Sequence, residues 1–277
     1  MENATASKSP VINTFLSFLA FIWLFPFLFV VINSLKSGRE YNTGNFWDFP
    51  SSISIAENFE HISTRIDFVS GFFNTILYGF TAALLAITFA ALAAYAISTL
   101  DIKGKLFWFL LIYSGTVFPF QMYLIPTFTL YSFTGLYDTK IGLITLYTAL
   151  CIPFCVFVLR NYFYSFPKEL VEAAKMDGAT DFKIFKQIYI PMAKAPIAAL
   201  FLFQFTWVWN DLLFGMTLSR SASIRPIMSS LSMLNSPQGT NNVPAVLLAA
   251  FIASVPTLII FMVLNKSFEK GFVLTSK

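Results

Sequence analysis

The side chains best suited to recognition lie together in residues 161–195, one polar segment of a very apolar chain. Small or apolar residues share one side of a predicted helix there: Leu170, Ala173 and Ala174. A basic amphipathic helix can rest on an anionic membrane, but four acids in this segment oppose that: Glu169, Glu172, Asp177 and Asp181. A protein groove that admits small residues closely is the better partner. The segment therefore predicts protein binding.

The same segment is too long for a plain turn and has the signals of two short helices. Pro167 suits the first helical position, and Gly178 suits the residue just past the helix end. Thr180 can cap a second helix that Pro191 ends. On that second helix, four residues are expected on one face: Phe182, Phe185, Ile188 and Tyr189. We predict a helix–Gly–helix element over residues 165–191.

A second group of polar residues interrupts the apolar stretches. Asn210 and Asp211 come late in one stretch, and Gln121 and Gln204 lie inside two of them. Intramembrane acids and amides are costly and often mark solute pathways, so these four are candidates for lining a translocation path. For Asp211 a structural role stays equally open, since Arg220 or Arg225 could pair with it.

Several other chemistries are excluded. The chain has no GxxxxGK[ST] loop, so it is not expected to hydrolyse ATP or to hold a cofactor of its own. Cys151 and Cys155 lie in one apolar run, where they are interpreted as small buried hydrophobes, not metal ligands or a redox pair. The formal charge of +4 comes from short connectors and forms no patch for nucleic acid. Residues 1–11 do not resemble a cleaved signal.

The composition is that of a membrane protein. Of the 277 residues, 57% are hydrophobic and 12% charged, against about 45–50% and about 25% in soluble proteins. A bilayer core needs about 20 apolar residues per helix. Six stretches qualify: 11–32, 71–97, 106–131, 141–160, 196–218 and 243–264. The third contains Pro119 and Pro126 and is expected to be kinked or broken. We predict an all-α integral membrane protein with a single domain over residues 1–277.

Lys and Arg set the orientation, because cytoplasmic loops carry more of them. If the N-terminus is inside, twelve lie inside: Lys8, Lys103, Lys105, Arg160, Lys168, Lys175, Lys183, Lys186, Lys194, Lys266, Lys270 and Lys277. Six then lie outside: Lys36, Arg39, Arg65, Lys140, Arg220 and Arg225. Both termini and residues 161–195 are therefore expected in the cytoplasm.

The second stretch also carries small residues at every fourth position: Ala82, Ala86, Ala90, Ala94 and Ser98. Such a stripe lets helix backbones approach closely in lipid. Packing within this subunit and packing against a second subunit are both compatible with the pattern.

One motif in the polar segment has a known counterpart. The run EAAKMDGATDFKIFKQIYIP resembles the EAA signature of ATP-binding-cassette (ABC) importer permeases, with matches at Glu172, Ala173, Ala174, Gly178, Ile188, Ile190 and Pro191. The fuller form, with Asp177-Gly178-Ala179, is similar to the branch that imports oligosaccharides and polyols, of which the maltose transporter is the best known. Asn74, Asp138-Thr139 and Trp209-Asn210-Asp211 also look like the smaller, six-helix permease of that branch. The C-terminal tail, NKSFEKGFVLTSK, resembles the family's Gly-rich ending only loosely.

The resemblance implies a function and a set of partners. Residues 165–191 would be a coupling helix element seated in a cleft of an ATPase subunit, with Glu172 contacting a basic side chain. The partners would be a homologous second permease, an ATPase dimer that binds ATP and Mg²⁺, and an extracytoplasmic sugar-binding protein. The chain would be a transport subunit, not an enzyme, in a bacterial cytoplasmic membrane.

Three alternatives are weighed against this function. Within the same transporter class, the solute could be a polyol or a glycerophosphodiester-like compound. A secondary transporter would show an internal repeat and charged mid-membrane sites, and the last three stretches do not repeat the first three. A structural membrane scaffold would need no EAA element.

Overall fold

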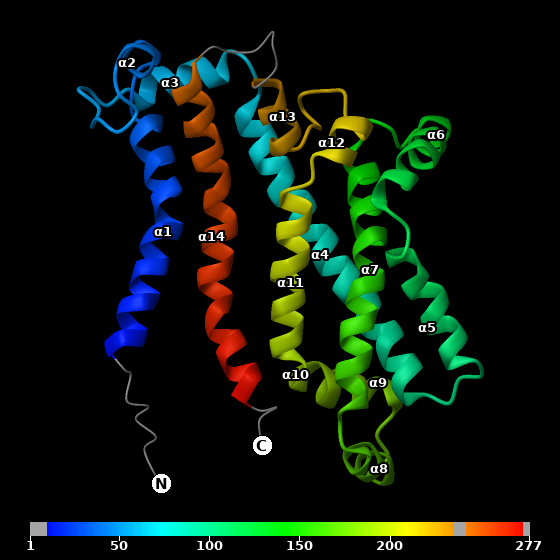
Figure 1. The fold of residues 1–277 in the computed structure, drawn as a ribbon. Coiled ribbons are helices and arrows are strands. Elements are labelled where there is room, and N and C mark those ends of the chain that lie inside the picture. The colour runs from blue at the N-terminus through cyan, green and yellow to red at the C-terminus, as the bar shows by residue number, and fades with distance from the viewer. Residues whose placement is uncertain (1–9, 235–241, 274–277) are drawn as a thin grey trace. The chain divides into compact units, whose positions relative to one another are not determined.

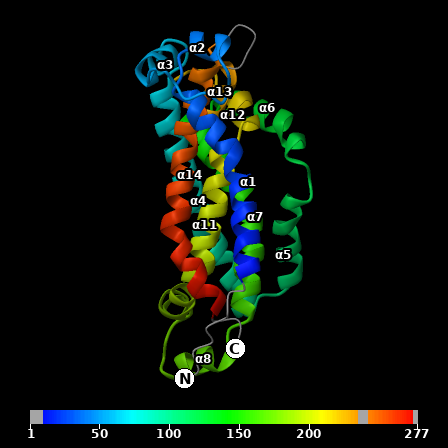
Figure 2. The same ribbon diagram turned by 60° about the vertical axis from the view of Figure 1, so that its left-hand side comes forward.

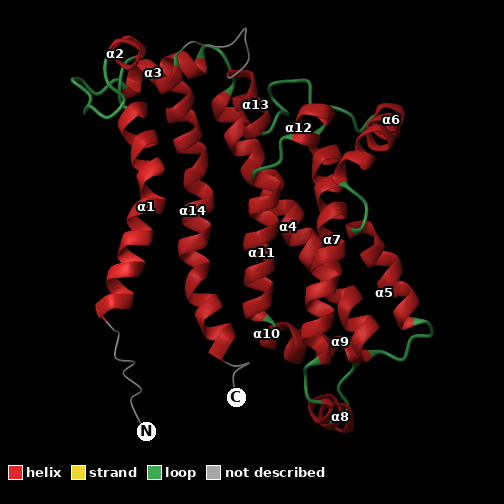
Figure 3. Cartoon of the chain, in the orientation of Figure 1, coloured by secondary structure: helices red, strands yellow, loops and turns green. Residues whose placement is uncertain are grey.

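Residues 10–234 and 242–273 are described in a computed structural model, and all regular elements in these ranges are helices (Figure 3). The chain divides into two compact units, Met1–Ile66 with Met233–Ser254 and Asp67–Ser232 with Val255–Lys277. Two helices cross the boundary between them, α13 (Ile227–Leu234) and α14 (Val243–Val273). The predicted all-α fold is confirmed.

The first unit contains α1 (Pro10–Ser34), α2 (Gly38–Thr43) and α3 (Ile55–Ser63). Lys36 is only 1% exposed, and its Nζ donates to the carbonyls of Asn45 and Phe46 at 2.8 and 3.2 Å. The amide of Asn58 donates to the carbonyls of Ser34 and Lys36. These bonds fasten α3 and the loop before it to the end of α1.

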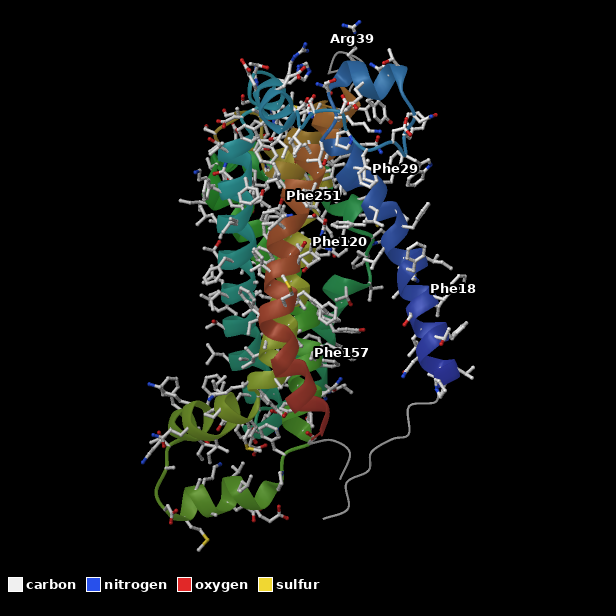
Figure 4. All side chains as sticks on the ribbon, turned by 90° about the vertical axis from the view of Figure 1, so that its left-hand side faces the viewer. Phe18, Phe29, Arg39, Phe120, Phe157 and Phe251 are labelled. Carbon is white, nitrogen blue, oxygen red and sulfur yellow. The ribbon has the colours of Figure 1, made fainter. Side chains whose placement is uncertain are left out.

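The body of α1 is uncovered. None of its most apolar stretch is buried, although the mean hydropathy of that stretch is 2.7. Figure 4 shows side chains such as Phe18 projecting away from the helix. An apolar surface of this kind suits lipid, where a helix satisfies its own backbone hydrogen bonds.

In the second unit, α4 (Phe68–Thr99) and α7 (Lys140–Tyr164) form the central pair, and α11 (Lys194–Trp209) packs on α4 (Figure 1). Buried on the α4 side of this pair are four alanines, each 0% exposed: Ala82, Ala86, Ala90 and Ala94. They share buried clusters with Tyr147, Cys151, Cys155 and Leu159 of α7. The stripe therefore packs within this subunit. The alternative prediction, that these alanines pack against a second subunit, is wrong.

The third predicted span is broken. It consists of α5 (Lys105–Tyr113), the 3₁₀ turns η1 (Ser114–Thr116) and η2 (Phe120–Tyr123), and α6 (Leu124–Thr134), with a bend of 92°. The break falls at Pro119, where the missing N–H and fixed φ of proline interrupt a helix. The phenol of Tyr123 bridges the break by donating to the carbonyl of Gly115.

The fifth predicted span, 196–218, is wrong at its C-terminal end. α11 stops at Trp209, and a separate short helix, α12, covers Leu213–Leu218. The amide of Asn210 donates back to the carbonyl of Thr206, while the carboxylate of Asp211 accepts the backbone N–H of Phe214 and of Gly215. The Asp211 carboxylate, one residue before the N-cap Leu212, thus satisfies two N–H groups in the first turn of a new helix, which favours a break there.

Four described helices are long and apolar enough to cross a bilayer: Pro10–Ser34, Phe68–Thr99, Lys140–Tyr164 and Val243–Val263. The number rises to six if each of two bent pairs counts as one span, and one of those pairs is the broken third span. The other pair joins residues 181–192 to α11 at 74°.

The buried stripe leads to a stability prediction. Replacing Ala86 by Leu should cost about 1–3 kcal/mol, because the added side chain has no space between α4 and α7. Thr88→Leu on the exposed side of the same helix is the control and should cost less. Thermal unfolding of the purified protein in detergent measures both, and equal melting temperatures would contradict the packing described.

Candidate functional site

The predicted helix–Gly–helix element is present, with its turn at Gly178. α8 (Lys168–Met176) ends at Asp177, and Gly178 has a φ of +74°. The N–H of Gly178 donates to the carbonyl of Lys175, and that of Ala179 donates to Ala174. This is the Schellman pattern of a helix end, which needs a left-handed residue such as glycine. Thr180 then accepts the N–H of Lys183 and starts α9 (Asp181–Ile184).

The second helix passes through a π-helical turn, η3 (Phe185–Tyr189), and ends with α10 (Ile190–Met192), one residue beyond the predicted end at Pro191. A proline inside a helix lacks an N–H and crowds the carbonyl four residues earlier. The wider π turn before Pro191 gives that carbonyl room. The chain then bends by 74° at Ala193, between Met192 and the start of α11 at Lys194.

One side of this element is fastened to the bundle. Ile184, Phe185 and Tyr189 are buried, and Val171 and Ala174 pack against the same cluster. Two hydrogen bonds add to this packing: Tyr95 donates to the carbonyl of Asp181, and Thr99 donates to the Tyr189 hydroxyl. Phe182, expected on the buried face, is instead 66% exposed, and Ile184 occupies the buried side.

The other side is open to a partner. Ala173, Asp177 and Gly178 are exposed, as are three apolar side chains: Leu170, Met176 and Phe182. Glu172 is exposed too, and it also lines a cavity of about 400 Å³ beside Thr99 of α4 and Tyr189. Met176 is 89% exposed. Of the predicted coupling residues only Ala174 turns inward, so its small size serves packing on the bundle. The element lies beyond one end of α4 and α7, while α6 and α12 lie at the opposite end (Figures 1 and 2).

The four predicted path residues gather around two neighbouring cavities of the second unit. Gln121, Asn210 and Asp211 line a cavity of about 550 Å³, and Gln204 lines one of about 360 Å³. Both cavities are also lined by Phe120, Phe203 and Trp207. Phe120, labelled in Figure 4, comes from the break between α5 and α6, and Asn210 and Asp211 come from the break after α11. The two broken segments therefore border the same space.

Asp211 does not pair with Arg220 or Arg225. Its Oδ2 accepts the hydroxyl of Tyr147 at 2.8 Å and the N–H of Gly215 at 2.9 Å. The expected pairing is wrong because the capping position turns the carboxylate towards α12 and α7. Tyr147 carried no sequence signal, since it lies 64 residues away in an apolar run. The aromatic lining was equally hard to single out among 34 phenylalanines.

Asp138 and Asn74, two residues of the family resemblance, fix the loop between α12 and α13. Asp138, at a φ of +55°, accepts the N–H groups of Arg220 and Ser221 at 2.8 and 2.9 Å. Burial opposes ionisation, yet the hydrogen bonds from Ser221 and Arg220 hold the pKa of Asp138 below its usual value. Asn74 donates to the carbonyl of Ser223. The loop is therefore held by α4 and by the turn between α6 and α7.

Known proteins resemble this chain in sequence and in fold. Residues 86–274 match the family described as binding-protein-dependent transport system inner membrane component. The osmoprotective compounds uptake permease protein GgtD of Synechocystis is 33% identical over 92% of this chain and 87% of its own. The arabinooligosaccharides transport system permease protein AraQ of Halalkalibacterium halodurans is 30% identical over 95% of both chains.

A solved structure has the same fold. A chain of a bacterial ABC transporter involved in the import of the acidic polysaccharide alginate superposes with a TM-score of 0.78 at 24% identity. The match covers 97% of this chain and 100% of that one. Since the family match includes the helix–Gly–helix element and the residues around both cavities, the chain belongs to the inner membrane components of binding-protein-dependent transport systems.

Proposed function

We propose that this permease carries a sugar, most simply an oligosaccharide, across a bacterial cytoplasmic membrane. An extracytoplasmic binding protein delivers the solute, a homologous second permease completes the path, and an ATPase dimer supplies the energy from ATP and Mg²⁺. Support for the solute class comes from AraQ and from an alpha-glucoside transport system permease of Rhizobium meliloti, which is 29% identical over 78% of this chain. The binding protein has a parallel in the alginate importer, solved in complex with a ligand-bound periplasmic protein.

The observation that carries the proposal is the two-sided element around Gly178. Its inner side is packed on the ends of α4 and α7, and its outer side offers acids and apolar side chains to another protein. A partner that moves α8 would therefore also move the bundle, because the contact is packed and not flexible. The chain continues directly from α10 into α11, which ends beside the cavities. This geometry supports coupling to ATP hydrolysis in another subunit, with Glu172, Ala173, Asp177 and Gly178 proposed to lie at the contact.

A second solute class has its own support. The relative GgtD is named for osmoprotective compounds, so a small polyol-like solute is the other candidate. Both candidates predict the same partners. The cognate binding protein, titrated with neutral oligosaccharides and with polyols by calorimetry, would separate the two.

The reconstituted complex gives the overall test. Loaded binding protein should stimulate ATP hydrolysis by the complex and drive uptake into proteoliposomes. Uptake that proceeds without ATP, on an ion gradient alone, would refute the proposal in favour of a secondary transporter.

The orientation is tested by cysteine labelling. In a chain carrying Cys151→Ala and Cys155→Ala, an impermeant thiol reagent should label Glu57→Cys in intact cells. It should label Asp177→Cys only after permeabilisation, because residues 161–195 are proposed to be cytoplasmic. Both positions are exposed, so accessibility within the protein does not bias the comparison. Labelling of Asp177→Cys in intact cells would invert the topology.

Gly178→Val should abolish coupling. A β-branched residue at a φ of +74° costs on the order of 1 kcal/mol or more, and relief of that strain would move α8. Gly135→Val is the matched control, since Gly135 has a φ of +75° at the end of α6 and, like Gly178, has nothing within 4 Å of an added Cβ. Stimulated ATPase activity should fall in the first variant and persist in the second. Equal loss in both would point to general strain.

Glu172→Ala should leave the element folded and weaken ATPase binding. A charged contact at an interface is worth roughly 1.5–3 kcal/mol, which corresponds to about a tenfold or larger loss of affinity. Glu169→Ala removes an equally exposed acid from the same helix and serves as the control. Pull-down of the ATPase subunit across a concentration series measures both, and unchanged affinity in Glu172→Ala would remove this residue from the contact.

A further inference from the structure

The two cavities described above have a composition that bears on which solutes pass. Among the described residues that line them, Asp211 is the only ionisable one, and none is Lys, Arg or His. The volumes of about 360 and 550 Å³ are within the range of small-molecule sites, about 300–1,000 Å³. The space could therefore hold a sugar ring or two.

Trp207 is one of the aromatic residues that line both cavities. Its ring packs against another aromatic ring on each of two sides. The ring centroid lies 5.2 Å from that of Phe120 and 6.2 Å from that of Tyr147, the latter edge-on. Tyr147 is itself fixed, because it is 1% exposed and its hydroxyl donates to Asp211. A half-buried indole held in this way is a pre-organised flat apolar surface, which is what the C–H face of a sugar ring packs against.

Amide side chains lie at the edge of this surface. Gln121 is exposed and forms no side-chain hydrogen bond within the described part of the chain. Asn210 uses one amide hydrogen on the carbonyl of Thr206 and keeps its Oδ1 as an acceptor. Amides both donate and accept, so they can pair with hydroxyl groups, whose hydrogens rotate to suit.

The charge at the site argues against acidic solutes. The carboxylate of Asp211 accepts three donors, all neutral: the Tyr147 hydroxyl and the N–H groups of Phe214 and Gly215. No cation of the described lining stands ready to receive a second carboxylate, and a carboxylate of the solute close to that of Asp211 would be repelled by it.

We propose that this subunit itself contacts the transported solute at Trp207, Gln121 and Asn210, and that this subsite selects neutral sugars against uronates. The inference rests on the proposed function and narrows its solute class. It also predicts a difference from the structurally similar importer, which is involved in the import of an acidic polysaccharide.

Protection of a cysteine from alkylation tests the subsite directly. The purified complex, without binding protein, carries Leu212→Cys in the cysteine-free chain, because Leu212 lines the larger cavity, is 40% exposed and is not a proposed contact. Maltotriose or arabinotriose should slow its alkylation at least fivefold, and trigalacturonate should not. Leu130→Cys, exposed on α6 and outside both cavities, is the control and should react at one rate throughout.

Substitutions at Trp207 and Gln121 test whether these side chains contact the sugar. Trp207→Leu and Gln121→Ala should each raise the sugar concentration for half-protection at least tenfold, while Trp207→Phe, which keeps a ring, should lose less. Gln121 is exposed, so its variant stays informative if Trp207→Leu folds poorly. Equal protection by trigalacturonate and the neutral sugars, or protection by glycine betaine instead of sugars, would overturn the proposal.

Uptake separates this inference from the proposed function. If ATP-driven uptake with the binding protein succeeds for maltotriose or arabinotriose but that sugar gives no protection, the permease function stands and the subsite is refuted. Uptake restricted to trigalacturonate would refute the neutral selectivity in the same way. Protection by a neutral sugar in a complex that shows no ATP-driven uptake would leave the subsite supported and the proposed function refuted.

Discussion

Lipid offers a helix no hydrogen-bonding partner for its backbone, and this constraint governs where the second unit can be irregular. Each break is bridged by a nearby side chain. Tyr123 donates to the carbonyl of Gly115 across the first, and Asn210 and Asp211 bond the two helix ends at the second. Both breaks border the larger cavity. These two breaks thus lie beside a space that is lined by protein side chains.

The α4–α7 pair links this space to the element around Gly178. Alanines along α4 bring the two helices close, and a tyrosine near each end of the pair forms a hydrogen bond to a neighbouring segment. At one end Tyr95 bonds the backbone of Asp181, and at the other Tyr147 bonds Asp211. Because packed helices transmit displacement better than flexible loops, a movement of α8 can reach the far end. Under the proposed function, the α4–α7 pair would carry the effect of ATP hydrolysis in a partner subunit to the cavities.

Local features were predictable from the sequence and distant pairings were not. The Gly178 turn depends on residues within one helical turn, so its left-handed conformation followed from residue type alone. Asp211 was singled out as an acid in an apolar stretch, but its partner Tyr147 is 64 residues away and looks like any aromatic residue of a membrane helix. The alanine stripe was compatible with two partners, because a small side chain specifies close approach and not the neighbour. The end of span five was misjudged because hydropathy does not register a capping carboxylate.

The bend between the helix–Gly–helix element and α11 lies just after Pro191. α10 ends at Met192, and the chain turns by 74° at Ala193 into α11. The π turn over Phe185–Tyr189 comes directly before α10. Tyr189, in that turn, is buried and bonded to Thr99, which anchors the bend to α4. Under the proposed function, a contact made at α8 would act on α11 through this bend, and α11 ends at Trp209, directly before the break that borders the larger cavity.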